Sequence, residues 1–149
     1  MSLGPGFVAL ALLVAGGAAR AEWVGGANTE VPLDGNGATW LVHATLNGSV
    51  SGLFLIDTGA SLCVVGPGTA RRLNVSPTGE EVQLQTANGT VRAPVIRVRT
   101  FDVGGNRARD VPAVVHPAVG PPLDGILGLS YLNNFSYSID PKRRVLRLR

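Results

Sequence analysis

The chain has few of the residues from which metal sites and cysteine chemistry are built. Its 149 residues include one cysteine and two histidines, so no cluster has the spacing of zinc ligands. It also lacks the Gly-x-Ser-x-Gly elbow of serine hydrolases and the Gly-x-x-x-x-Gly-Lys loop that binds phosphates. The sequence therefore predicts neither a metal nor a cofactor.

Charged residues are also scarce, at 15%, whereas 45% of the residues are hydrophobic. This composition favours a packed globule over a disordered chain or one that coats nucleic acid. Much of the net charge of +3 comes from a basic cluster at the C-terminal end, formed by Lys142, Arg143, Arg144, Arg147 and Arg149. Because no aromatic residues are interleaved there to stack on bases, we interpret this cluster as a solvated strand edge and expect no nucleic-acid partner.

The chain has no apolar run of the length that a membrane-spanning helix needs, about 20 residues, since the run at 7–15 is too short. This run is followed by Ala19-Arg20-Ala21, the small-x-small pattern that signal peptidase accepts. We expect residues 1–21 to be a signal peptide and the protein to be periplasmic or secreted. The alternative is an uncleaved N-terminus that tethers the protein to the membrane.

Export would place the protein in an oxidising compartment, where disulfides form. Cys63 is the only cysteine of the sequence and so has no intrachain disulfide partner. We interpret it as a small buried hydrophobic residue. The alternatives are a nucleophile or an intermolecular disulfide, although neither His nor a carboxylate lies beside it in the sequence.

Glycine and proline are frequent, with 20 and 10 residues, and they separate short stretches of alternating hydrophobicity. This pattern is typical of a turn-rich β protein. We expect residues 22–37 to be an extended lead-in rather than a core element, and residues 38–149 to form one domain. The expected strands are 39–46, 50–57, 82–85, 91–98, 101–103, 111–115, 136–139 and 144–148, with one helical turn at 69–73. Asn47-Gly48 and Ala87-Asn88-Gly89 predict hairpin turns.

The clearest chemical signal is Asp57-Thr58-Gly59-Ala60, which directly follows the apolar run 53–56. That run is apolar on both faces, which predicts a central strand. An acid at the end of such a strand can be aimed outwards by a tight turn. We expect Gly59 to take a backbone conformation closed to most other residues.

This motif resembles the active-site motif of the retropepsin-like aspartic proteases, and in particular of their bacterial exported branch. Thr86-Ala87-Asn88-Gly89 resembles the start of the flap, and Ile126-Leu127-Gly128 resembles the element that packs beneath the catalytic turn. Leu129–Leu132 fits the start of the short C-terminal helix. The resemblance spans about residues 31–148 and implies an all-β fold, a closed barrel of short strands with one short C-terminal helix. It also implies that Asp57 is catalytic, that Thr58 and Gly59 orient it, and that Ala60 lines the cleft.

For a chain of this size the resemblance also implies a homodimer, and the mechanism gives a reason. Two carboxylates must share one proton, so that one activates a water while the other polarises the scissile carbonyl. Like charges about 3–4 Å apart repel by roughly 4 kcal/mol at an effective dielectric constant near 20, so the pair titrates as one unit. The chain has one Asp-Thr-Gly, and a twofold axis would supply the second. Asp124-Gly125 could be an internal partner, but it lacks the hydroxyl residue, and we interpret Asp124 as a turn residue.

The resemblance therefore implies an aspartic endopeptidase that cleaves peptide or protein substrates. In two-lobed pepsins a hydroxyl residue usually stands where this chain has Ala60, and hydrogen bonds to carboxylates lower their pKa. Because alanine cannot donate such a bond, we expect only a mildly acidic optimum. One alternative is a catalytically silent, dimeric peptide-binding or scaffolding module of the same fold in the periplasm. Another is a monomer that docks on an anionic surface through its basic C-terminus.

Overall fold

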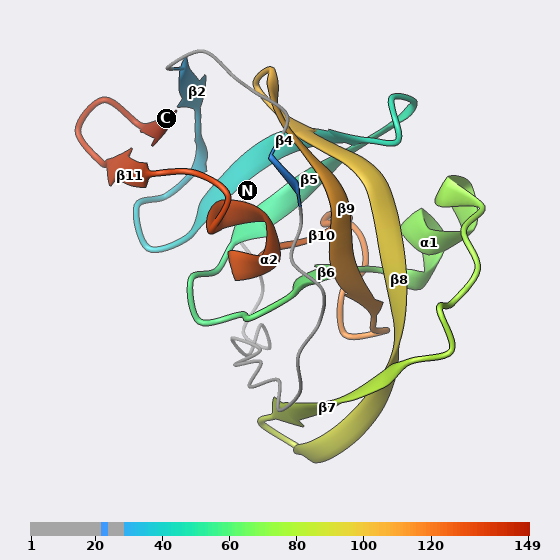
Figure 1. Ribbon diagram of the computed structural model, residues 1–149. Coiled ribbons are helices and arrows are strands. Elements are labelled where there is room, and N and C mark those ends of the chain that lie inside the picture. Colours follow the sequence, from blue (N-terminus) through green and yellow to red (C-terminus); the bar gives the residue numbers. More distant parts are fainter. Residues whose placement is uncertain (1–21, 24–28) are drawn as a thin grey trace.

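Six strands of the structure close into a barrel (Figure 1). The computed structural model describes residues 22–23 and 29–149, so the expected signal peptide lies outside the described residues. The strands are β1 (Glu22–Trp23), β2 (Thr29–Pro32), β3 (Asp34–Gly35), β4 (Trp40–Leu46), β5 (Val50–Ile56), β6 (Cys63–Val65), β7 (Glu81–Thr86), β8 (Gly89–Val103), β9 (Asn106–Val115), β10 (Gly125–Leu127), β11 (Tyr137–Asp140) and β12 (Val145–Leu148). The helices are α1 (Pro67–Leu73) and α2 (Leu129–Leu132). The predicted all-β, closed-barrel fold is confirmed.

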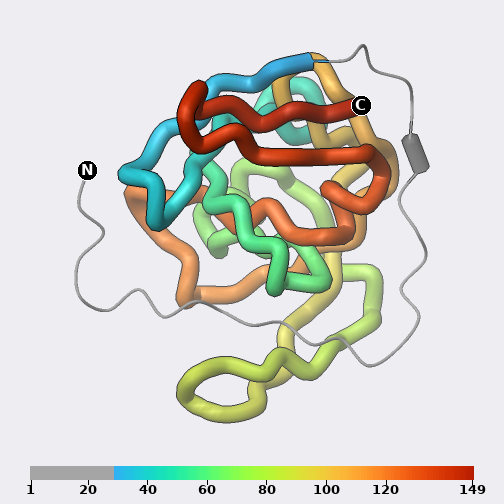
Figure 2. The backbone as a smooth tube through the Cα atoms, turned by 90° about the vertical axis from the view of Figure 1, so that its left-hand side faces the viewer, coloured from blue at the N-terminus to red at the C-terminus, as the bar shows by residue number. Residues whose placement is uncertain are grey.

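The barrel runs from β9 through β6, β10, β5, β4 and β8, and closes where β8 pairs with β9. The pairs β10–β5 and β6–β9 are parallel, and the other pairs around the barrel are antiparallel. A second sheet has the order β11-β12-β2. Figure 2 shows β2, in blue, and β12, in red, side by side, although they lie near opposite ends of the described chain.

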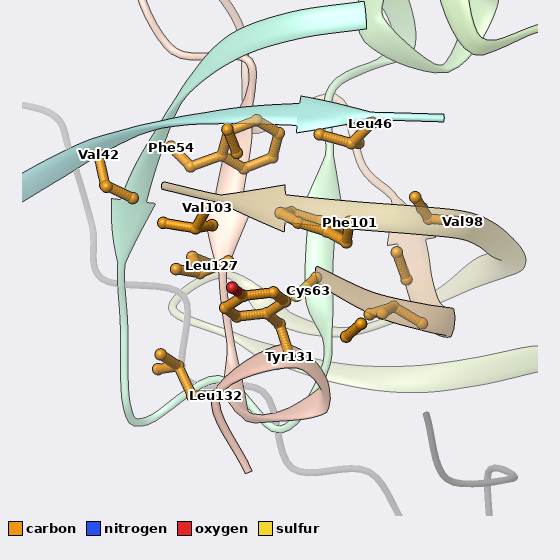
Figure 3. Packing of buried hydrophobic residues seen from close by; sticks show 14 of the residues in the cluster. Val42, Leu46, Phe54, Cys63, Val98, Phe101, Val103, Leu127, Tyr131 and Leu132 are labelled. Atoms are coloured by element: carbon orange, nitrogen blue, oxygen red, sulfur yellow. The ribbon is translucent and has the colours of Figure 1, made fainter. Parts of the chain in front are cut away.

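A row of aromatic rings connects the barrel to α2 (Figure 3). The ring centroids of Phe54 and Phe101 are 5.3 Å apart, those of Phe101 and Tyr131 are 5.2 Å apart, and those of Tyr131 and Phe135 are 5.0 Å apart. The Tyr131 hydroxyl donates to the carbonyl oxygen of Asn106 at 2.7 Å, so the phenol is both packed and hydrogen-bonded. Each such ring pair contributes about 0.5–1.5 kcal/mol beyond its buried area. The aromatic row therefore fixes α2 against the barrel.

The strands differ from the expectations mainly in length. Segments 91–98 and 101–103 belong to one strand, β8, and β9 begins at Asn106 rather than at residue 111. Thr100, between the two expected segments, continues the ladder opposite Arg109. The three-residue strand β6 was not predicted. The expected helical turn at 69–73 is confirmed as part of α1.

The expectation that residues 22–37 form no core element is wrong. β1 pairs with β9, and β2 pairs with β12. Val31 and Leu33 are buried, with 6% and 5% of their surfaces exposed. The buried Val31 and Leu33 alternate with exposed residues such as Glu30 and Asp34, so the sequence of this segment gives only a weak hydrophobic signal.

The basic C-terminal cluster is partly neutralised rather than simply solvated. Arg143 makes a two-pronged ion pair with Glu30 of β2, at 2.6 and 2.7 Å. Arg147 lies 3.1 Å from Glu30 and 3.1 Å from Asp140. These contacts join the two ends of the described chain across the smaller sheet. Among the described residues, no helix is long and apolar enough to cross a membrane.

Candidate active site

Asp57 directly follows β5, and its turn is closed by hydrogen bonds from its own chain. The Asp57 N–H donates to the carbonyl oxygen of Leu127 at 3.1 Å, and the Ala60 N–H donates to the Asp57 carbonyl oxygen at 3.2 Å. The Gly59 N–H donates to the carboxylate oxygen Oδ1 of Asp57 at 2.9 Å. Asp57 is half-buried, Thr58 and Gly59 are exposed, and Ala60 is buried. The turn therefore holds its carboxylate at the surface in a defined orientation.

Glycine is needed at position 59 for a different reason from the expected one. Gly59 is not among the glycines with positive φ. A Cβ atom built there would lie 3.1 Å from Oδ1 of Asp57, a contact tighter than most side chains make. The missing side chain thus leaves room for the carboxylate to approach the Gly59 N–H.

The segment Ile126-Leu127-Gly128 lies against this turn. Ile126 and Leu127 belong to β10, between β5 and β6, and Gly128 precedes α2. The Leu129 N–H donates to the carbonyl oxygen of Ala60 at 2.8 Å. A Cβ on Gly128 would lie 2.7 Å from that same oxygen, so only glycine allows this approach. The structure brings together two motifs that are some 70 residues apart in the sequence.

The segment Thr86-Ala87-Asn88-Gly89 forms the tip of the β7–β8 hairpin, which projects from the barrel (Figure 2, yellow-green). Thr86 pairs with Gly89, and the Thr86 hydroxyl donates to the Gly89 carbonyl oxygen at 2.8 Å. Gly89 has φ of 112°, a conformation that side chains disfavour. Behind the tip, the buried hairpin residue Leu84 belongs to the same apolar cluster as Ala60 and Ile126. Apolar packing therefore links the hairpin to the Asp57 turn.

These elements lie in the part of the chain that known proteins share. A family model described as aspartyl protease matches residues 42–131, which include the Asp57 turn, the hairpin and Gly128. The chain belongs to the aspartyl protease family. A search of curated proteins found no match.

The fold of this family member is retropepsin-like. The crystal structure of a retropepsin-like aspartic protease from Rickettsia conorii matches it with a TM-score of 0.59 and 20% sequence identity. The match covers 88% of this chain and 94% of that chain. At this identity the likeness concerns the fold, and it agrees with the resemblance that Asp57-Thr58-Gly59-Ala60 suggested.

A second set of bonds behind the turn was not predicted from the sequence. The Cys63 N–H donates to Oγ of Ser130 at 2.8 Å, and that hydroxyl donates to the Pro112 carbonyl oxygen at 2.8 Å. Ser130 therefore ties β6, β9 and α2 together. Cys63 is fully buried, as predicted, and burial raises the pKa of its thiol. Nothing in the sequence around Ser130 signals this role, because both partners are distant.

Asp124, which we interpret from the sequence as a turn residue, makes several long-range hydrogen bonds. Its Oδ2 accepts the Leu53 N–H at 2.9 Å, and its Oδ1 accepts from Arg72 at 2.6 Å and from the Thr69 hydroxyl at 3.2 Å. Leu53 lies four residues before Asp57 on β5, which places the two acids about 13 Å apart along the strand. Asp124 is therefore too distant to share a proton with Asp57 in the same chain.

Within residues 22–23 and 29–149, no group of three or more His, Cys, Asp or Glu side chains could hold a metal ion.

Proposed function

We propose that the protein is an aspartic endopeptidase whose active site forms when two copies bring their Asp57 carboxylates together. The observation that carries this proposal is the Asp57 turn itself. It holds one carboxylate, oriented by the Gly59 N–H at 2.9 Å, at the surface of a retropepsin-like barrel. The sequence contains one Asp-Thr-Gly, and the carboxylate of the other candidate acid, Asp124, binds Leu53 and Arg72.

In the proposed reaction, one Asp57 is ionised and the other carries the shared proton. The ionised carboxylate takes a proton from a water, whose oxygen attacks the carbonyl carbon of the scissile amide. The protonated carboxylic acid donates its proton to the carbonyl oxygen. The tetrahedral intermediate collapses when the amide nitrogen takes the proton that the first carboxylate gained from water and the C–N bond breaks. One hydroxyl group of the intermediate gives its proton to the second carboxylate, which returns the pair to one shared proton. Water is the nucleophile, so the reaction requires no cofactor.

We propose extended peptides as substrates, bound as a strand between the β7–β8 hairpin and the Asp57 turn. The apolar cluster that contains Leu84, Ala60 and Ile126 supports this arrangement, because it links the two elements. Gly89 at the tip supplies backbone freedom for the hairpin to move over a substrate. We further propose that the protein acts outside the cytoplasm, on the basis of the apolar run and the Ala19-Arg20-Ala21 pattern that precede the barrel.

The proposal is tested with Asp57→Asn, with Asp110→Asn as the matched control. Asp110 is exposed and has φ of 52°, which asparagine tolerates well, so the control should fold and function normally. On a mixed peptide library, Asp57→Asn should lower the cleavage rate by about 10²- to 10⁴-fold. An unchanged rate in folded Asp57→Asn protein would eliminate the mechanism. Peptide binding without any cleavage by the wild type would favour the silent binding module instead.

Mixing the wild type with Asp57→Asn tests whether the site needs two copies. If subunits exchange at random, nine equivalents of the mutant should reduce the activity of each wild-type subunit to about one tenth. A site built within one chain would keep its full activity in the same mixture. The two outcomes differ tenfold, so the experiment separates a dimeric site from a monomeric one.

A mildly acidic activity optimum is also part of the proposal. Ala60 is buried beside the turn, and its methyl group cannot donate a hydrogen bond to the carboxylate pair. A pH profile of the purified dimer that peaks in the strongly acidic range typical of pepsin would contradict this expectation.

A further inference from the structure

Asp124 makes five hydrogen bonds around the start of β10. Its N–H donates to the Leu53 carbonyl oxygen at 2.8 Å, and its Oδ2 accepts the Leu53 N–H at 2.9 Å. One residue thus satisfies both backbone groups of Leu53. The next residue along, Gly125, begins the parallel pairing with Phe54. Asp124 therefore sets the point at which β10 joins β5.

The same carboxylate binds α1. Its Oδ1 accepts a charge-assisted hydrogen bond from Arg72 at 2.6 Å and a second bond from the Thr69 hydroxyl at 3.2 Å. The Asp124 carbonyl oxygen accepts the N–H of Gly66, the residue before α1, at 3.0 Å. We call Asp124, Leu53, Thr69 and Arg72 the Asp124 clamp. The acid in its centre has 28% of its side chain exposed, against 50% for Arg72.

Gly52 leaves room for the clamp. A Cβ at this position would lie 2.7 Å from Cβ and 2.8 Å from Oδ2 of Asp124. The carboxylate therefore sits directly on the backbone of β5, where few other side chains would fit. A larger acid at position 124 would have no space for its additional methylene on this side.

We propose that Asp124 is a positioning residue for Asp57. β5 and β10 pair in parallel from Phe54–Gly125 to Ile56–Leu127, and the next bond joins the Asp57 N–H to the Leu127 carbonyl oxygen. The Asp124 clamp fixes one end of this short ladder, and Asp57 stands at the other. A catalytic acid must be held within about 0.5 Å of its productive position, so loosening the ladder at Asp124 reduces the rate at Asp57. This inference rests on the proposed function of Asp57.

Three variants test the clamp in graded steps. Asp124→Ala removes the acceptor of the Leu53 N–H and the carboxylate that pairs with Arg72. We expect kcat to fall about tenfold or more while KM changes by less than about twofold. Asp124→Asn keeps an oxygen for the Leu53 N–H but loses the charge, so its kcat should be intermediate. Arg72→Gln should reproduce the effect of Asp124→Asn, and the double variant should be no worse than either, because both remove the same ion pair.

Asp102→Asn is the matched control. Asp102 is an acid on β8 that also pairs with an arginine, Arg107, at 3.3 Å, and 20% of its side chain is exposed. It lies outside the β5–β10 ladder. The kcat of Asp102→Asn should remain within about twofold of the wild-type value, since the Asp102–Arg107 ion pair is not part of the ladder that leads to Asp57.

Amide hydrogen exchange provides a readout that does not depend on cleavage. In Asp124→Ala or Asp124→Asn, the Asp57 N–H should exchange at least about tenfold faster, while the amides of β12 are unchanged. If the wild type cuts no peptide but this local change occurs, the proposed function fails and the positioning inference stands. Unchanged kcat per folded molecule and unchanged Asp57 exchange in both Asp124 variants would overturn the inference. Equal losses of kcat in Asp102→Asn would overturn it too.

Discussion

Replacing Gly128 with alanine should destabilise the protein through crowding alone. Its backbone angles, φ −102° and ψ −171°, are open to any residue. A Cβ at this position would lie 2.5 Å from the Leu62 carbonyl oxygen and 2.7 Å from the Ala60 carbonyl oxygen. Both obstacles are backbone atoms of the segment that follows Asp57, so they cannot rotate away as a side-chain end can. Overpacking of this kind costs about 1–3 kcal/mol of unfolding free energy.

The measurement is the urea midpoint of unfolding, with Gly120→Ala as the matched control. For a slope of about 1.5 kcal/mol per molar urea, a loss of about 2 kcal/mol lowers the midpoint by about 1.3 M. A Cβ on Gly120 meets nothing within 4 Å, and this glycine does not have positive φ. Gly120→Ala should therefore leave the midpoint unchanged or raise it, since alanine lowers the entropy of the unfolded chain. Equal midpoints for the two variants would refute the crowding argument.

Three further results are expected. Tyr131→Phe should lower the unfolding free energy by about 1–3 kcal/mol in thermal denaturation, because the Asn106 carbonyl oxygen loses a buried donor. Hydrogen bonds from Arg143 and then Arg147 lower the pKa of Glu30 below its ordinary value of 4.5. The ionised Glu30 side chain therefore stabilises the folded protein fully above pH 4.5, and this stabilisation is lost as the pH falls through the lower pKa of the folded state. The melting temperatures of wild type and Glu30→Gln should accordingly differ at neutral pH and converge in acid, whereas a constant difference would contradict the linkage. Because burial raises the pKa of Cys63, a thiol reagent should label native protein slowly and urea-unfolded protein quickly; rapid native labelling would count against burial.

The parts of the fold that were predicted correctly depend on local signals. Residues 53–56 are apolar on both faces, and β5 indeed lies between β4 and β10. Asn47 stands at the β4–β5 turn with φ of 51°, as the Asn-Gly signal indicated. The β7–β8 hairpin turns at Ala87 and Asn88 for the same kind of reason. In each case a few neighbouring residues carry the information, so no tertiary knowledge is required.

The parts that were missed depend on distant partners. Asp124 reads as a turn residue because its sequence neighbours are Leu123 and Gly125, whereas its side-chain partners Leu53 and Arg72 are 71 and 52 residues away. The pairing of β2 with the C-terminal strand was not predicted for the extended lead-in, because the Arg143 that binds Glu30 is 113 residues distant. Local pattern alone cannot reveal such contacts, since a polar residue looks the same whether it faces water or a partner.

The bonds that hold Asp57 bear on how a dimeric site would assemble. Its N–H is bound by Leu127 and its carboxylate by Gly59, and both partners belong to its own chain. Under the proposed function, each copy therefore orients its acid before the copies meet. Under the proposed function, association need not build the turn, and the remaining electrostatic cost is the approach of two like charges, which a single shared proton removes. A site whose halves are already rigid loses less conformational entropy on assembly than one that folds as it forms. This is the physical reason for expecting that contacts within each chain, such as the Asp124 clamp, affect the rate at Asp57.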